Sequence, residues 1–179
     1  MRVICAVLAS VALVLVVLYP NLYLGAVQAS NEIAGLESLI DPDDELVMLV
    51  GEHLRITGET PESWVQRNIE WVSDYDLYLN LEYWATPAET ILAGKGDCED
   101  RAIVSSSINR YLEREATVVT QLDHVYVVVD GKPYFGVSET RSTKELVAKL
   151  VEQVPLARKV AIAAGLLLIW AHAVFRRPT

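Results

Sequence analysis

The chain has 179 residues, of which 52% are hydrophobic, and its formal net charge is −9. This length is enough for one compact domain. All 24 acidic residues lie between Glu32 and Glu152, and 12 of the 15 basic residues lie between Arg55 and Lys159, so the net charge of the central part from Glu32 to Lys159 is near −12. This charge argues against nucleic acid or an anionic lipid surface as the main partner of the domain.

The first apolar run covers residues 1–29 and opens with Arg2. Two interpretations stay open. The run is either a signal peptide cleaved after the small-residue site Val27-Gln28-Ala29, or a transmembrane anchor, because about 20 apolar residues span a bilayer. Both interpretations send the chain from Ser30 onward across the membrane.

A second apolar run covers Val160 to Phe175, 16 residues or about 24 Å of helix, and Arg176-Arg177 follows it. We expect a transmembrane segment with its basic end in the cytoplasm; the alternative is a buried core helix. The predicted organisation is residues 1–29 as signal peptide or anchor, 30–157 as a domain facing outside the cytoplasm, and 158–179 as a membrane segment with a basic tail.

The first half of the domain has clear helix signals. The acidic turn Asp43–Glu45 precedes an apolar stripe that Gly58 ends, which predicts one helix. Thr60-Pro61 begins a second helix, and Thr86–Glu89 has the pattern of a capping box for a third. The aromatic segment Asp74–Trp84 lacks periodicity, so we expect an ordered loop there.

The segment Gly96-Asp97-Cys98-Glu99-Asp100 predicts a further helix, capped by Asp97 and Asp100. Backbone N–H groups and the helix dipole at such a start favour a thiolate or a developing oxyanion. The carboxylates of Glu99 and Asp100 act in the opposite direction, because they raise the pKa of a nearby thiol. Cys98 is therefore a candidate nucleophile, and the alternative is an inert core thiol.

An extended pattern follows this helix. Ala116–Gln121 predicts one strand, while His124–Val129 and Lys132–Ser138 predict a hairpin with Asp130-Gly131 as its two-residue turn. A histidine that opens an apolar strand is a natural general base for a cysteine nucleophile, so His124 is the candidate partner of the thiol. Helices followed by a small antiparallel sheet give an α+β fold.

These segments resemble the transglutaminase-like superfamily, in particular its bacterial and archaeal cysteine-proteinase-like members with a papain-like fold. Gly96–Asp100 is similar to the family's nucleophile segment, Glu82–Thr90 to the lead-in before it, and His124–Val127 to its histidine strand. The likeness covers about residues 64–140. It implies a thiol enzyme that hydrolyses amide bonds or transfers the acyl group to an amine through a Cys-His-acid triad.

The acidic member of the triad is where the chain departs from the family, whose hairpin often ends in Asp-Pro-Thr. If Asp130-Gly131 is the turn, His124 pairs with Val137, and Glu139 shares the face of His124 with about 7–8 Å between backbones. Glu139 is therefore the predicted third member, while Asp123 points to the other face. A register slip by one residue would reverse the two faces.

Other side chains have weaker signals. Tyr83 and Trp84 either line a substrate groove beside the thiol or serve as packing residues. We expect His53 to pack on a helix and His172 to have no role, and no cofactor or metal site is predicted. The expected partners are a protein or peptide substrate and, through the terminal segments, the lipid membrane. The competing function is an inactive domain of the same fold that acts as a cell-surface binding or adaptor module.

Overall fold

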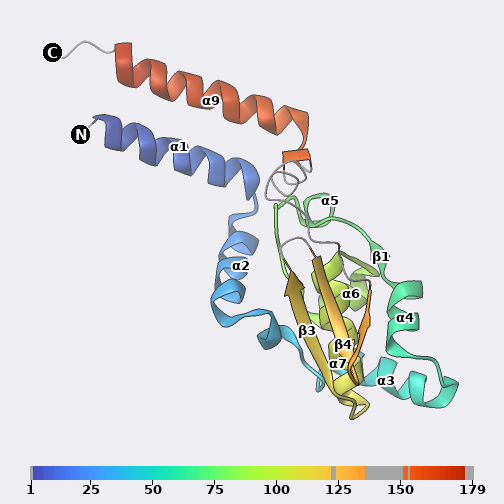
Figure 1. Cartoon of the computed structure of the whole chain (residues 1–179). Coiled ribbons are helices and arrows are strands. Elements are labelled where there is room, and N and C mark those ends of the chain that lie inside the picture. The colour runs from blue at the N-terminus through green and yellow to red at the C-terminus, as the bar shows by residue number, and fades with distance from the viewer. Residues whose placement is uncertain (1, 122–123, 136–150, 153, 176–179) are drawn as a thin grey trace.

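The computed structural model describes residues 2–121, 124–135, 151–152 and 154–175. Helices and a small antiparallel sheet make up the fold, which confirms the predicted α+β class (Figure 1). The helices are α1 (Arg2–Leu18), α2 (Leu22–Ala34), the 3-10 helix η1 (Leu36–Leu39), α3 (Glu45–Thr57), α4 (Pro61–Asn68), α5 (Asp74–Tyr78), α6 (Pro87–Ala93), α7 (Cys98–Tyr111) and α9 (Leu156–Phe175). The strands are β1 (Glu70–Trp71), β2 (Lys95–Gly96), β3 (Ala116–Gln121), β4 (His124–Val129) and β5 (Lys132–Tyr134).

Local hydrogen bonds explain where the predicted helices begin and end. The side chain of Asp44 accepts hydrogen bonds from two backbone N–H groups at the start of α3, and Gly58 ends that helix in the left-handed conformation. Thr60 caps α4, and Thr86 and Glu89 form the predicted capping box of α6. These three helix starts are confirmed.

The prediction of a loop over Asp74–Trp84 is wrong in its first half, where α5 forms. The side chain of Ser73 accepts a hydrogen bond from the N–H of Asp76, and Leu79 ends the helix at a φ of 62°. A helix of five residues is too short for apolar periodicity to reveal it.

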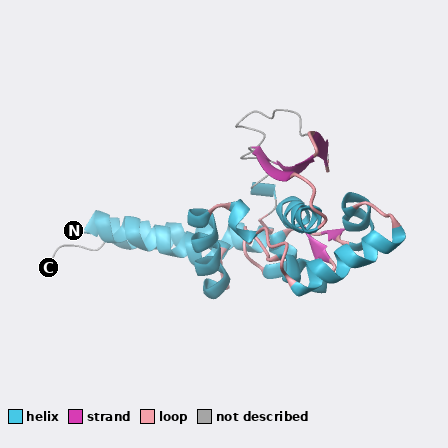
Figure 2. Cartoon of the chain, turned by 90° about the horizontal axis from the view of Figure 1, so that it is seen from below, coloured by secondary structure: helices cyan, strands magenta, loops and turns pink. Residues whose placement is uncertain are grey.

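The sheet has the order β3-β4-β5, with antiparallel neighbours. Asp130 and Gly131 both have positive φ and form the predicted two-residue turn, so that Val129 pairs with Lys132 as expected. Alternate residues of β4 (Val125, Val127, Val129) are buried, and α7 packs against this strand. The sheet lies on one side of α7 and the other domain helices lie on the opposite side (Figure 2).

Helix α7 forms the centre of the domain, where every residue from Ala102 to Asn109 is buried. On its helical side, Val104 and Ile108 join an apolar cluster with residues of α3 and α4. On its sheet side, Ala102 and Ile103 pack with Val125 of β4. The burial of α7 on all sides fixes its N-terminal end, which carries Cys98.

The two terminal helices α1 and α9 lie side by side and extend away from the domain, with both chain ends at the same end of the pair (Figure 1). Gly165 permits the close approach, because a Cβ at this position would lie 2.4 Å from a methyl carbon of Leu13. Helix α9 has 20 residues and none is buried, so the buried-core alternative is wrong. By length and composition α9 can cross a membrane, and α1 and α2 meet the same criterion only as a pair bent by 98°.

Arg158 joins the terminal helices to the domain. Its guanidinium donates hydrogen bonds to the carbonyl oxygens of Val17 (2.9 Å) and Leu79 (3.0 Å). It also lies 4.4 Å from the centre of the Tyr75 ring, in a cation–π contact. The start of α9, the end of α1 and the α5 region therefore meet at one side chain.

Candidate active site

Cys98 is the first residue of α7, as predicted, and short-range contacts hold it there. The parallel pair of β1 and β2 aligns Trp71 with Gly96. A Cβ on Gly96 would lie 2.7 Å from the Cβ of Asp100, so this position requires glycine. Asp97 caps α7 by accepting a hydrogen bond from the N–H of Glu99. The Gly-Asp-Cys spacing thus places the thiol at the helix start.

The thiol of Cys98 is half-buried and touches both its neighbour in sequence and the sheet. Its Sγ donates a hydrogen bond to Oε2 of Glu99 at 2.8 Å. The backbone of Val125 lies near enough to the thiol to favour its ionised form. Val125 is the residue after His124, so the start of α7 meets the head of β4 at the sulfur atom.

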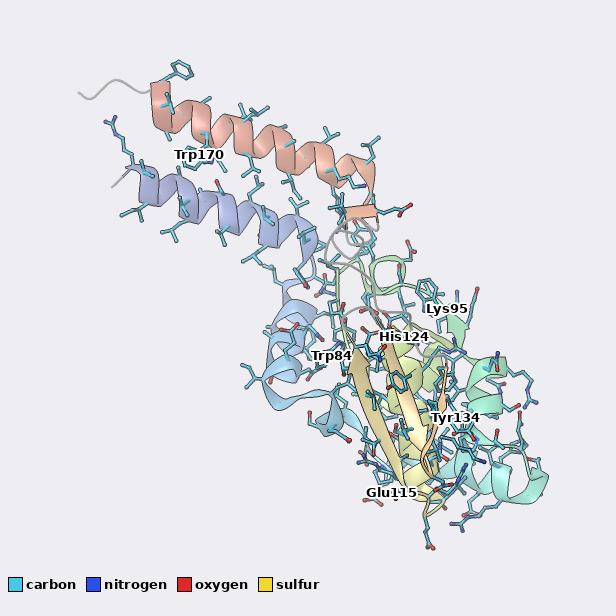
Figure 3. All side chains as sticks on the ribbon, viewed as in Figure 1. Trp84, Lys95, Glu115, His124, Tyr134 and Trp170 are labelled. Atoms are coloured by element: carbon cyan, nitrogen blue, oxygen red, sulfur yellow. The ribbon has the colours of Figure 1, made fainter. Side chains whose placement is uncertain are left out.

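His124 lies at the head of β4 and has partners of its own. Its Nε2 is 2.9 Å from the carbonyl oxygen of Phe135, and its ring stacks on that of Tyr126. Burial alternates along β4, with Val125 on the buried side and His124 on the other. The fold therefore brings the two elements together, but the thiol and the imidazole have different hydrogen-bond partners. His124 and Trp84 lie at the end of the domain nearer the terminal helices, and Glu115 lies at the far end (Figure 3).

Arg101 is a site residue that the sequence did not reveal. Its guanidinium lies 5.3 Å from the centre of the Phe135 ring and close enough to Cys98 for the two charges to attract each other. Burial lowers the pKa of Arg101. Arg101 lies three residues after Cys98, which is one helical turn, and this spacing was the available signal. A guanidinium here favours a thiolate on Cys98.

Burial of the thiol and the carboxyl groups around it outweigh that attraction. Burial, followed by the charges of Glu99 and Asp97, raises the pKa of Cys98 well above its ordinary value. The expectation that the helix start favours a thiolate is therefore not met in this arrangement. The thiol is protonated at neutral pH.

Five carboxyl groups surround this end of α7 and are called the acidic cluster below: Asp74, Glu82, Asp97, Glu99 and Asp100. Burial raises the pKa of Glu82 to about 8 and those of Glu99 and Asp100 to about 7. Burial also raises the pKa values of Asp74 and Asp97, and the neighbouring carboxylates add to the rise. Much of the cluster therefore holds protons at neutral pH.

Two groups of side chains at this end of α7 have ligand atoms close enough together to hold a cation. Asp97, Cys98 and Glu99 bring their ligand atoms within 4.8 Å of one another, and so do Asp74, Asp97 and Asp100. One buried oxygen of Asp74 and one of Asp100 have no hydrogen-bond partner among the described residues. Carboxylate oxygens suit a hard cation such as Ca²⁺ or Mg²⁺. The prediction of no metal site considered His and Cys spacing and did not consider these carboxylates.

Tyr83 and Trp84 occupy different positions. Tyr83 is 4% exposed, donates a hydrogen bond to Glu89 and packs edge-on against Tyr78, which is the environment of a packing residue. Trp84 is half-buried, and its indole N–H donates a hydrogen bond to Glu82 at 2.9 Å. Trp84 therefore borders the acidic cluster.

The remaining predicted residues lie elsewhere. Glu139 and Asp123 lie outside the described residues, so the third triad member stays a prediction. His53 is exposed on α3. His172 lines a hollow of about 580 Å³ between α1 and α9, together with Arg2 and Cys5.

Comparison with models of known families, with curated proteins and with solved structures finds no match to this chain.

Proposed function

We propose that the protein is a membrane-tethered thiol enzyme of transglutaminase-like type that acts on amide bonds. Cys98 is the nucleophile, His124 the base, and Glu139 the acid that orients the imidazole. The packing of α7 against β4, with the backbone of Val125 near the thiol of Cys98, carries this proposal, because it joins the helix start to the histidine strand.

In the reaction, His124 takes the thiol proton while Sγ attacks the acyl carbon, and backbone N–H groups at the start of α7 stabilise the oxyanion. The amide C–N bond then breaks and His124 returns the proton to the leaving amine. Water or a second amine attacks the thioester and regenerates the thiol. For this reaction the His124 ring turns from Phe135 towards Cys98, since catalytic hydrogen bonds often form only with substrate bound.

A specific observation favours the second candidate, an inactive binding module of the same fold. The thiol of Cys98 is protonated at neutral pH and donates to Glu99, while His124 contacts the carbonyl oxygen of Phe135. A domain freed from catalysis would tolerate this arrangement. The two candidates differ in whether Cys98 forms an acyl adduct.

The terminal helices support attachment to a membrane. Large apolar side chains of α1 and α9 are exposed along both helices, including Val3, Leu15, Leu168 and Phe175. In the sequence, three basic residues flank the outer ends of the two helices (Arg2, Arg176 and Arg177), against two at the start of α9 (Arg158 and Lys159). Positive residues favour the cytoplasmic side, which supports a domain outside the cytoplasm.

Contacts of α2 support retention of the N-terminal segment as an anchor. Gln28 Oε1 accepts a hydrogen bond from the N–H of Trp84, and Asn31 donates to the carbonyl oxygen of Trp84. Cleavage after Ala29 would cut α2 between Gln28 and Asn31 and remove one of these two supports.

The test uses the full chain in lipid nanodiscs, with Cys5→Ser so that Cys98 is the sole thiol. The protein is incubated with an activated acyl ester and with a peptide bearing a chromogenic C-terminal amide. We expect an acyl adduct on Cys98 by mass spectrometry and release of the chromogenic amine, neither of which Cys98→Ala should show. A folded protein that forms no adduct and releases no amine would support the binding module instead.

A further inference from the structure

Helix α2 carries an exposed apolar stripe on the side that faces away from the domain. Its members recur at helical spacing and present no charge: Leu22, Ala26, Ala29 and Ile33. Leu22 is 64% exposed and Ile33 is 90% exposed. The opposite side of α2 binds the domain through Gln28, which is 2% exposed. The stripe is therefore the outer face of a helix that the domain holds in place.

The angle between α1 and α2 is fixed by contacts with the domain. Pro20 ends α1, and the Asn21 side chain caps α2. The backbone of Asn21 also exchanges two hydrogen bonds with the fully buried side chain of Asn80, at 3.2 and 3.1 Å. The N–H of Leu81 donates to the carbonyl oxygen of Leu18 at 3.1 Å. These four contacts set the 98° bend between the two helices.

The stripe faces the side towards which α1 extends. A hollow of about 350 Å³ occupies the angle between the two helices, lined by Leu15 and Tyr19 of α1 and by Leu22, Ala26 and Ala29 of α2, with the polar Gln28 and Glu32 along one side. Figure 1 shows the same arrangement: α2 runs across the direction of α1 and α9, between these helices and the sheet. A helix at 98° to a membrane span lies close to the plane of the membrane.

We propose that α2 lies on the bilayer surface, with the stripe Leu22, Ala26, Ala29 and Ile33 seated at the boundary between headgroups and acyl chains. This inference rests on the proposed membrane anchoring by α1 and α9. The bilayer is the occupant because the stripe continues directly from the end of α1, which packs along the candidate span α9, and points to the same side. Tyr23, which is 76% exposed beside the stripe, is a residue type enriched at membrane interfaces.

The charge of α2 distinguishes it from helices that require anionic lipid. It contains no Lys or Arg, and its Glu32 accepts a hydrogen bond from Gln28. Apolar contact is therefore the source of binding, and zwitterionic lipid suffices. Gln28 and Asn31 form hydrogen bonds with the backbone of Trp84. A position of α2 on the bilayer surface therefore also places the Cys98 end of the domain next to the membrane.

The test is spin labelling of the full chain in phosphatidylcholine nanodiscs, in a background with Cys5→Ser and Cys98→Ser. Labels go on Ala29→Cys and Ile33→Cys in the stripe and on Leu168→Cys in α9. Ile56→Cys serves as the control, because Ile56 is apolar and 85% exposed on α3, away from the proposed interface. The readout is the ratio of collision rates with oxygen, which concentrates in lipid, and with a water-soluble nickel chelate.

We expect the oxygen rate to exceed the nickel rate at Ala29, Ile33 and Leu168, and the reverse at Ile56. Nickel-accessible labels at both Ala29 and Ile33 with a lipid-exposed label at Leu168 would overturn the inference and leave the anchoring intact. A nickel-accessible label at Leu168 would overturn the anchoring and the inference together. Spin–spin broadening at Ile33 that dilution with unlabelled protein removes would show a second copy on the stripe, which also overturns the inference.

Discussion

Helix α7 has buried carboxyl groups near both ends, in different surroundings. Towards its C-terminal end, Glu62 of α4 accepts hydrogen bonds from Asn109 (2.6 Å) and Ser105 (3.5 Å), and Arg114 lies 4.0 Å away. At the N-terminal end, the acidic cluster places five carboxyl groups around Cys98. Both ends bury carboxylate oxygens without a hydrogen-bond partner among the described residues: Glu62 Oε2, which has Arg114 nearby, at one end, and one oxygen each of Asp74 and Asp100, among further carboxyl groups, at the other.

We interpret the surroundings of Glu62 as structural and the acidic cluster around Cys98 as functional. A buried carboxylate with donors and a cation nearby is compatible with a stable fold. Crowded carboxyl groups with raised pKa values cost stability, and such groups concentrate at functional sites. The N-terminal end of α7 therefore combines a nucleophilic side chain with an environment that stability alone does not favour.

The largest effect should come from His124→Ala, which removes the proposed base at the N-terminal end. Turnover of the peptide amide should fall by about 10²- to 10⁴-fold, the range typical of general base catalysis. The melting temperature should change little, because His124 is half-buried at the head of β4. Steady-state kinetics and thermal melting measure both, and unchanged turnover would exclude the proposed dyad.

Glu139→Gln should have the next largest effect on turnover. The amide keeps the shape of the side chain but removes the charge that stabilises an imidazolium on His124. We expect a loss of roughly tenfold to a thousandfold in kcat with the fold intact. Asp123→Asn is the matched control. If Asp123→Asn is the crippling change and Glu139→Gln is silent, the register beyond Tyr134 differs from the prediction by one residue.

Asn109→Ala should disturb the hydrogen bonds around Glu62 at the C-terminal end of α7 and leave the surroundings of Cys98 unchanged. It removes the shortest hydrogen bond to Glu62 and leaves a buried carboxylate short of donors. The free energy of unfolding should fall by about 1–3 kcal/mol. Chemical denaturation measures this loss, while the alkylation rate of Cys98 in the folded protein should match wild type. A change in that rate would show that the two ends are coupled.

The acidic cluster should make the protein more stable in acid than in mild base. Unfolded carboxyl groups titrate near pH 4, but Glu82, Glu99 and Asp100 titrate near pH 7–8 in the fold. The folded state thus binds more protons between these values, so stability falls as pH rises from about 4 to about 8. With chelator present, the melting temperature should be higher at pH 5 than at pH 8.

Asp100→Asn should reduce the difference between the melting temperatures at pH 5 and pH 8 by about 2–4 °C. In a chain of this size, this change corresponds to roughly 1 kcal/mol. The asparagine can still accept the hydrogen bond from the N–H of Ala85. Glu89→Gln, outside the acidic cluster, is the control. A melting temperature that rises with pH in wild type would contradict the raised pKa values.

The sequence predicted those parts of the fold that depend on local hydrogen bonds. The caps at Thr60 and Thr86, the left-handed Gly58 and the Asp130-Gly131 turn each involve residues a few positions apart. The start of α7 at Asp97 belongs to the same class. Such features are readable because the interacting groups are close in the sequence.

The sequence did not predict features that depend on tertiary contacts. The acidic cluster joins Asp74 and Glu82 to a helix start some 15 to 25 positions later, and no periodic pattern marks that approach. The upward shift of the Cys98 pKa results mainly from burial of the thiol, and the sequence alone does not show this burial. The bend before α2 has a local signal in Pro20, but its angle depends on Asn80.

The most direct test is the rate of Cys98 alkylation between pH 6 and pH 10 in the Cys5→Ser protein, with Glu99→Gln and Glu62→Gln compared side by side. Wild type should titrate above the ordinary thiol pKa of about 8.5, because burial, Glu99 and Asp97 oppose the thiolate. Glu99→Gln should lower the midpoint and speed alkylation at neutral pH about tenfold for each pKa unit. Glu62→Gln should lower stability and leave the profile unchanged. A wild-type profile in Glu99→Gln, or an equal shift in Glu62→Gln, would contradict the assignment of chemistry to the N-terminal end of α7.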